Sequence, residues 1–267
     1  MRKTAALAGA VLTVLLLMSG CTGNLFMQLD QPEVPSSSEL NDKASTDPEG
    51  FISDVEDYLD GGAIDDSNAG DVNTALKDNI YDPSTGTPPS GEQEQKAALL
   101  IGEVAIAGND NAGKVVDNVP GVLSSIDDGT SSDPEAFIRE LLPAGLSSTE
   151  FNAMVAALVE AGEAYLDFGE SLDQDLDGTL EEVPFMSSAD IGDTLNRAAA
   201  GIALIAALDA MDGTVDGTYS TSYSSDLQNI VEGASYSGPD PTTAFDGSLT
   251  DYDGAQNLLE LAGFDVS

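Results

Sequence analysis

Apolar residues recur every three or four positions along much of the chain, which is the spacing of one face of an α-helix. The clearest run follows Ser147 and Glu150, whose separation of three residues is typical of a capping box at a helix start. The apolar positions of this run are Phe151, Met154, Val155, Leu158, Tyr165 and Phe168. The pattern predicts one long helix that ends near residue 170.

A second long helix is predicted from the cap-like pair Ser187 and Asp190 to Gly213. Within it, residues 198–208 are apolar on every side but too few to span a bilayer, so we expect a buried core helix. Further helices are predicted at 95–107 and, shorter, near 50–60, 70–79, 134–142 and 253–263. Residues 214–250 are rich in Gly, Ser, Thr, Tyr and Asp and are expected to be mostly loop.

Strand patterns are scarce, so the expected fold is all-α, an irregular helical bundle or a helical-repeat-like array over residues 47–267. Asp47-Pro48-Glu49 and Asp133-Pro134-Glu135 both have the composition of a helix start, with Asp as cap and Pro at the first helical position. Two similar apolar stretches follow these starts, and together they suggest duplicated halves, 47–132 and 133–226. Coincidence is the alternative, because such helix starts arise independently.

The first residues have the pattern of an export signal. A positive start, Met1-Arg2-Lys3, precedes an uncharged apolar run that ends at Met18-Ser19-Gly20-Cys21, and Cys21 is the only cysteine. Small residues before a lone cysteine resemble a bacterial lipobox. The resemblance implies a signal peptide over residues 1–20, a diacylglyceryl thioether on Cys21 and an acylated new N-terminus, with the membrane as partner. The alternatives are an ordinary signal peptide and an N-terminal helix that is not removed.

Residues 21–46 mix Pro, Ser and polar residues without periodicity, and we expect them to form a lipidated, flexible tether. Thr22 rather than Asp follows the lipobox cysteine. In lipoproteins of cells with two membranes this favours the outer membrane. The predicted location is therefore the cell envelope.

The charge is strongly negative, with 48 acidic residues against 8 basic ones and a formal net charge of −40. Repulsion of this size destabilises a compact state unless salt screens it. The excess of Asp, the scarcity of Lys and the absence of Trp resemble proteins of salt-loving microbes, and an ordinary acidic surface protein is the alternative. Nucleic acid is not expected as a partner, because phosphates bind to basic faces.

Residues 173–178, Asp-Gln-Asp-Leu-Asp-Gly, resemble the first half of an EF-hand calcium loop. Alternate residues of such a loop direct oxygen ligands at one Ca²⁺ ion, and Gly allows the sharp turn. The candidate ligands are Asp173, Asp175, Asp177, the backbone carbonyl of Thr179, Glu181 and Glu182. Pro184 stands where an EF-hand has its bidentate Glu, and a solvated acidic loop without a metal is the alternative.

Catalytic chemistry has little support in the sequence. The chain has no histidine, and its one cysteine is assigned to lipid, which excludes Ser-His-Asp and Cys-His nucleophiles and ordinary zinc sites. A hydrolase with paired carboxylates needs only Asp and Glu, but no pair stands out among so many.

The sequence therefore predicts a lipid-anchored envelope protein that is not an enzyme. Its expected role is binding or scaffolding, with Ca²⁺ bound at residues 173–184 and an envelope protein as a candidate partner. The alternatives are a tetratricopeptide-like adaptor that assists solute uptake and the carboxylate-pair hydrolase.

Overall fold

The computed structural model describes residues 32–127, 134–172, 183, 185, 186, 188–212, 223–234 and 253–261. Their elements are α2 (Ser37–Thr46), α3 (Pro48–Asp60), α4 (Ala69–Asn79), the 3₁₀ turn η2 (Pro83–Thr85), α5 (Glu92–Ala107), α6 (Asp110–Asp127), α7 (Pro134–Leu141), α8 (Ser148–Glu170), α9 (Ser188–Asp212), α10 (Ser224–Val231) and α11 (Asp253–Leu261). These residues include no strand, so the predicted all-α fold is confirmed.

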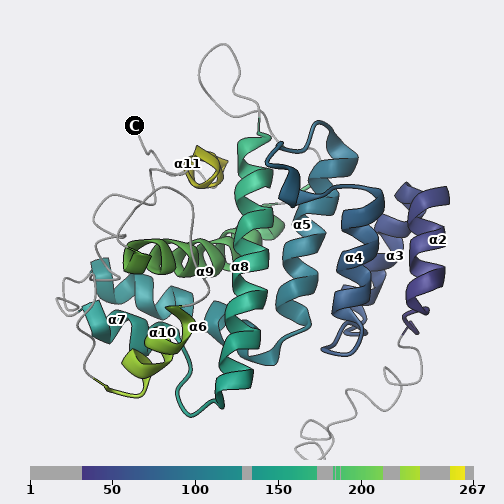
Figure 1. Ribbon diagram of the computed structural model, residues 1–267. Coiled ribbons are helices and arrows are strands. Elements are labelled where there is room, and N and C mark those ends of the chain that lie inside the picture. The colour runs from purple at the N-terminus through teal and green to yellow at the C-terminus, as the bar shows by residue number, and fades with distance from the viewer. Residues whose placement is uncertain are drawn as a thin grey trace, which may run out of the picture.

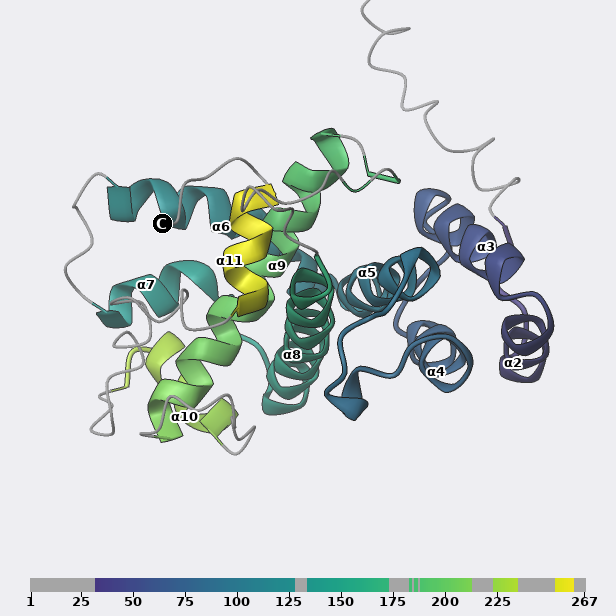
Figure 2. The same cartoon turned by 90° about the horizontal axis from the view of Figure 1, so that it is seen from above.

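Helix α8 lies at the centre of the molecule (Figure 1) and packs closely against both α5 and α9. Helices α2, α3 and α4 lie beyond α5, whereas α6, α7 and α10 lie on the opposite side of α8 (Figure 2). The first half of α8 contributes Met154 and Leu158 to a core shared with α6, α7, α9 and α10. Its second half contributes Tyr165 and Phe168 to a core shared with α2 to α5 and α11. The two cores are therefore joined through one helix.

Two predicted helices, α3 and α8, begin at the capping residues that the sequence indicates. The Ser147 hydroxyl accepts a hydrogen bond from the backbone N–H of Glu150, and the Glu150 carboxylate accepts one from the Ser147 N–H at 2.8 Å. Asp47 caps α3 by accepting from the Gly50 N–H, with Pro48 in the first turn. These bonds satisfy backbone N–H groups that have no partner inside the helix.

The apolar stretch 198–208 of α9 is buried as predicted. Ala200, Leu204, Ala207 and Leu208 are each at most 1% exposed. In the part of the chain that the structure describes, no helix combines the length and the apolar character needed to cross a membrane.

Glycines bring α8 into backbone contact with α9 and with α11. A Cβ atom placed on Gly201 of α9 would lie 2.6 Å from the backbone nitrogen of Gly162 in α8. A Cβ on Gly169 of α8 would lie 2.0 Å from the carbonyl oxygen of Gly254 in α11. Since any larger residue would push the helices apart, these glycines set the distances between the central helices.

The predicted flexible tether over residues 21–46 is wrong in its last part. Residues Ser37–Thr46 form α2, which opens with a capping box between Ser36 and Glu39. Leu40 and Ala44, four residues apart on one face, are buried in the core with α3 and α4. This short apolar face is the signal that the sequence interpretation missed, and it makes α2 part of the folded domain.

Helices α6 and α10 were not predicted either. Gly113 and Pro120 lie within the bounds of α6 and lower its intrinsic helix propensity. Packing of Ala112, Val115 and Val119 against α7, α8 and α9 compensates for this. Helix α10 lies inside the segment expected to be mostly loop, and it buries Leu227, Ile230 and Val231. In both cases tertiary packing outweighs local preference.

Candidate functional site

The site residues predicted from the sequence lie outside the described part of the chain. This holds for Cys21 and for the candidate calcium ligands Asp173, Asp175, Asp177, Thr179, Glu181 and Glu182. The calcium loop falls between the end of α8 at Glu170 and the start of α9 at Ser188. Among the residues that the structure describes, no three Asp, Glu, Cys or His side chains group closely enough to hold a metal ion.

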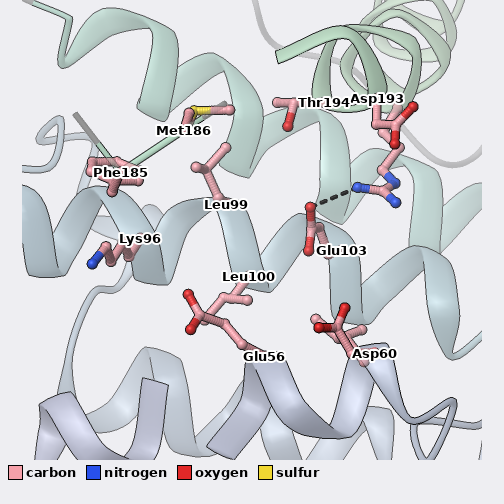
Figure 3. A pocket seen from close by; sticks show the side chains of 12 residues that line it. Glu56, Asp60, Lys96, Leu99, Leu100, Glu103, Phe185, Met186, Asp193 and Thr194 are labelled. Carbon is pink, nitrogen blue, oxygen red and sulfur yellow. Dashed lines mark hydrogen bonds and ion pairs between the residues drawn. The ribbon is translucent and has the colours of Figure 1, made fainter. Parts of the chain in front are cut away.

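A groove of about 390 Å³ lies between α3, α5 and the start of α9 (Figure 3). Its polar residues follow helical spacing on each element. Glu56 and Asp60 lie one turn apart on α3, and Asp193 and Arg197 lie one turn apart on α9. Figure 3 shows the α3 carboxylates on one side of the groove and Asp193 on the other.

The floor of the groove is apolar. Leu99 and Leu100 of α5 lie between the polar walls, and Phe185 and Met186, which precede α9, line the groove near Lys96 (Figure 3). Both leucines are less than a tenth exposed, so the groove reaches down to the main core. The result is a concave surface with charged walls and a hydrocarbon base.

Both cations of the groove are held by carboxylates. Arg197 Nη1 lies 2.6 Å from Glu103 Oε1, and Lys96 Nζ lies 2.8 Å from Glu92 Oε1. Lys96 Nζ also lies 5.2 Å from the centroid of the Phe185 ring, within the range of a cation–π contact. By contrast, Glu56, Asp60 and Asp193 form no ion pair with any basic side chain that the structure describes.

The groove continues at both ends. Glu56 and Lys96 also line a hollow of about 450 Å³ that reaches Glu49 and Glu92. Asp193 and Arg197 also line a hollow of about 540 Å³ against α6, with the acidic residues Asp110 and Asp117. Because neighbouring hollows share side chains, they form one continuous polar surface along α5. This surface is acidic at the Glu49 end and carries the basic side chain of Lys114 at the α6 end.

A buried tyrosine lies behind the ion pair of the groove. Tyr165 of α8 is fully buried, and its hydroxyl has no hydrogen-bond partner among the described residues. Its ring packs on α5 at Gly102, where a Cβ atom would lie 2.7 Å from the ring. Burial raises the pKa of Tyr165, the charge of Glu103 raises it further, and the charge of Arg197 lowers it. The two charges of the Glu103–Arg197 pair therefore have opposite effects on the Tyr165 hydroxyl.

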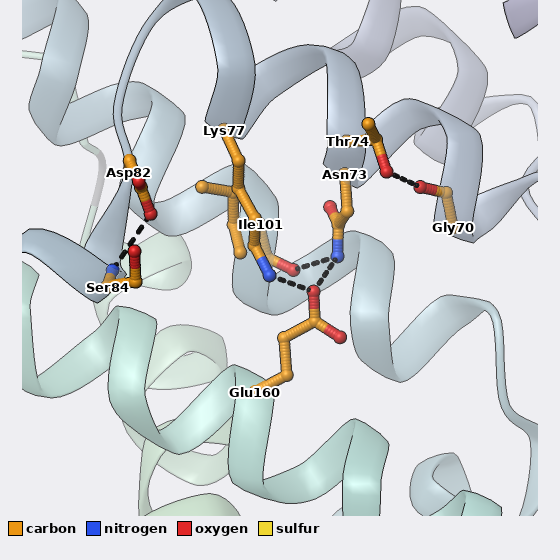
Figure 4. A network of polar contacts seen from close by, with 8 residues as sticks. All are labelled: Gly70, Asn73, Thr74, Lys77, Asp82, Ser84, Ile101 and Glu160. Carbon is orange, nitrogen blue, oxygen red and sulfur yellow. Dashed lines mark hydrogen bonds and ion pairs between the residues drawn. The ribbon is translucent and has the colours of Figure 1, made fainter.

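A polar cluster on another side of α5 holds three helices together (Figure 4). The side-chain amide of Asn73 in α4 donates to the Ile101 carbonyl of α5 at 3.1 Å and to Glu160 Oε1 of α8 at 2.9 Å. Lys77 Nζ donates to the same Glu160 oxygen at 2.6 Å. These bonds give the buried amide nitrogen of Asn73 its partners and join α4, α5 and α8, whereas the Asn73 side-chain oxygen has no partner among the described residues.

A hydrogen bond to an ionisable side chain, Asp167, holds the segment after α4 against α8. The Tyr81 hydroxyl lies 2.7 Å from Asp167 Oδ2, to which it donates, and 3.2 Å from the Thr87 carbonyl oxygen. Burial raises the pKa of Asp167 to about 6, although the hydrogen bond from Tyr81 lowers it, and the charges of Glu170 and Glu163 add to the rise. Near neutral pH the folded protein therefore carries an unfavourable, partly buried charge at this contact.

The raised pKa predicts a pH-dependent effect of Asp167→Asn, which keeps an acceptor for Tyr81. Protonated Asp167 favours the folded state, so its stabilising contribution is full below about pH 4 and lost as pH rises through about 6. At neutral pH we expect the free energy of unfolding of the variant to exceed that of the wild type by about 1 kcal/mol, a small value because solvent screens this partly exposed group. Near pH 4 the two proteins are expected to be equally stable. Thermal melts across this range measure the difference. Asp57→Asn, at an exposed site on α3, controls for the loss of one charge. If the difference in stability between Asp167→Asn and the wild type does not become smaller toward low pH, the raised pKa of Asp167 is contradicted.

The sequence interpretation missed the groove residues. One signal could have pointed to two of them: only 6 of the 8 basic residues follow the apolar signal region, and these include Lys96 and Arg197. Their carboxylate partners could not be chosen from 48 acidic residues without the fold.

Comparisons with protein-family models, with curated proteins and with solved structures find no match to this chain. The function is therefore argued from the residues and the geometry described above.

Proposed function

We propose that this protein is a lipid-anchored cell-envelope protein that binds a small solute in the groove between α3, α5 and α9. The observation that carries the proposal is the groove itself, with charged walls from α3 and α9 over an apolar floor from α5. Ligand sites are typically concave, with apolar surface and a few placed polar groups. The ion pairs of Lys96 and Arg197 hold the polar side chains in place before a solute arrives.

The lipobox-like sequence that ends at Cys21 supports the anchor. Acyl chains on this cysteine would hold the protein at a membrane, because each buried methylene contributes about 0.8 kcal/mol. The tether would then end before Pro32, because Pro32 lies against Gly61 and Val34 packs against the main core. Replacing Cys21 with serine is expected to abolish acylation, and mass spectrometry of the purified chain measures the loss of the lipid mass. The outer membrane is the proposed location in a cell that has one.

Ca²⁺ at residues 173–184 forms part of the same proposal. Its support is the spacing of Asp173, Asp175 and Asp177 before Gly178, together with the place of this loop between two long helices. Phe185 and Met186 follow directly and line the groove. A bound ion would therefore stabilise one edge of the solute site.

A panel of solutes tests the proposed binding function on the full chain in non-ionic detergent and molar salt. The panel contains inorganic and organic anions, zwitterionic amino acids, sugars and organic cations. We expect one chemical class to raise the melting temperature of the wild type, because a ligand that binds only the folded state stabilises it. Met186→Trp fills the groove without a change of charge and is expected to remove the effect.

Asn229→Trp is the matched control, because Asn229 is an exposed residue of α10 outside the groove. It should respond to solutes as the wild type does. If no class of solute raises the melting temperature, or if Met186→Trp responds as strongly as the wild type, the groove is not the binding site.

The two alternatives from the sequence have less support. A tetratricopeptide array repeats one helix pair of constant length, whereas α7 has 8 residues and α9 has 25. A carboxylate-pair hydrolase needs a carboxyl with a raised pKa beside a second carboxyl in a cleft. Asp167 has such a pKa, about 6, but it is not among the residues that line the groove.

A further inference from the structure

We infer that the solute is a linear aliphatic diamine or polyamine. Its ammonium groups would lie at the two walls of the groove, and its methylene chain would lie over the leucines of the floor. This inference rests on the proposed solute-binding function and adds the chemical class of the ligand.

The walls offer carboxylates without cations. Glu56 and Asp60 lie on the α3 side and Asp193 on the α9 side (Figure 3), and none of the three pairs with a basic side chain that the structure describes. A ligand with one positive charge would use one wall only. A ligand with two separated charges would use both walls, which favours a dication.

The groove already holds an alkylammonium group of its own. The side chain of Lys96 is a four-carbon chain with an ammonium head, and it lies in the groove with its head between Glu92 and the face of Phe185. This contact is independent of the three free carboxylates. It shows that a carboxylate and an aromatic ring at the edge of the groove accept the ammonium group that a diamine carries.

The apolar floor and the excess of carboxylates in the groove favour aliphatic amines over other solutes. Leu99 and Leu100 favour a ligand with a hydrocarbon chain, because each methylene removed from water adds to binding. A hydrated inorganic cation would gain nothing from these leucines. An anion would meet four lining carboxylates, Glu56, Asp60, Glu103 and Asp193, against two cations that are already paired.

The neighbouring hollows extend the same chemistry. Glu49 and Glu92 lie beyond one end of the groove, and Asp110 and Asp117 lie beyond the other. A polyamine longer than the groove would meet Glu49 and Glu92 at the first end, whereas Lys114 also lines the second hollow and opposes a cation there. Affinity is therefore expected to increase with the number of ammonium groups through the first end.

Calorimetric titration of the full chain at fixed salt tests the inference with cadaverine, pentylamine and spermidine. Cadaverine and pentylamine have the same carbon chain and differ by one ammonium group. We expect cadaverine to bind about tenfold more tightly than pentylamine, and spermidine at least as tightly as cadaverine. Equal affinity of cadaverine and pentylamine would overturn the inference.

Charge-removing variants locate the binding. The pair Glu56→Gln with Asp60→Asn is expected to weaken cadaverine binding about tenfold, and Asp193→Asn about threefold, because each removes one wall. Asp57→Asn also removes one charge from α3, but Asp57 does not line the groove, and its affinity for cadaverine should be unchanged. An equal loss in Asp57→Asn would show that amines bind to the overall negative charge rather than to the groove.

The solute panel separates failure of this inference from failure of the proposed function. If an anion, a sugar or a zwitterion stabilises the protein in a manner that Met186→Trp removes, while cadaverine does not bind, the groove binds solutes and the amine class is wrong. If no solute binds, both proposals fail.

Discussion

Replacing Gly201 with alanine is expected to lower the free energy of unfolding by about 3 kcal/mol, although alanine is the better helix former. The new Cβ atom would lie 2.6 Å from the nitrogen of Gly162 and 2.7 Å from the carbonyl oxygen of Leu158. Both are backbone atoms of α8, so no side-chain rotation relieves the contact. The central helices α8 and α9 must separate, and the packing of both cores is disturbed because α8 contributes to each.

Denaturant unfolding of Gly201→Ala and Gly192→Ala measures this effect within one helix. A Cβ atom on Gly192 would meet nothing within 4 Å, and this residue is exposed on α9. Its replacement should raise the free energy of unfolding by about 0.5 to 1 kcal/mol, because only the helix propensity changes. If both variants shifted stability in the same direction, the close approach of α8 and α9 would be refuted.

Molar salt is expected to raise the melting temperature by on the order of 10 °C relative to low salt. The formal net charge is −40, and the described ion pairs use few of the carboxylates, so most of them repel one another. At molar ionic strength the Debye length falls to about 3 Å, which removes most of this repulsion. For a chain of this size, such a shift corresponds to several kcal/mol.

Thermal melts in sodium, potassium and choline chloride test this prediction, with sucrose at equal osmolality as the uncharged control. All three salts should stabilise more than sucrose does, because screening does not depend on the cation. A melting temperature that does not change with salt would show that repulsion does not limit the stability of the fold.

Calcium chloride at matched ionic strength distinguishes a specific site from screening. We expect a further rise in melting temperature that is lost in both Asp175→Ala and Asp177→Ala, because each removes a proposed ligand. If the further rise persists in both variants, Ca²⁺ acts elsewhere. If Ca²⁺ behaves as the other cations do, the aspartates of this loop serve only as solvated charge.

The sequence by itself determined the helices whose signals are local. The capping box of Ser147 and Glu150, the Asp47-Pro48 start and the apolar stretch 198–208 each act within a few turns of one helix. Their energies depend on neighbours along the chain, so residue spacing is enough to predict them. The lipid anchor at Cys21 and the calcium loop are predictions of the same local kind, and they await their own tests.

Only the tertiary structure decided the groove and the unusual pKa values. Glu56, Lys96 and Arg197 come together because α3 and α9 both pack against α5, and nothing near them in sequence indicates it. The pKa of Asp167 likewise depends on its burial and on Tyr81, which lies 86 positions away. Helices α2 and α6 belong to this group, because their short apolar faces gain stability only against partner helices. Burial and contact are properties of the packed molecule, so these features follow from which helices meet rather than from spacing along the chain.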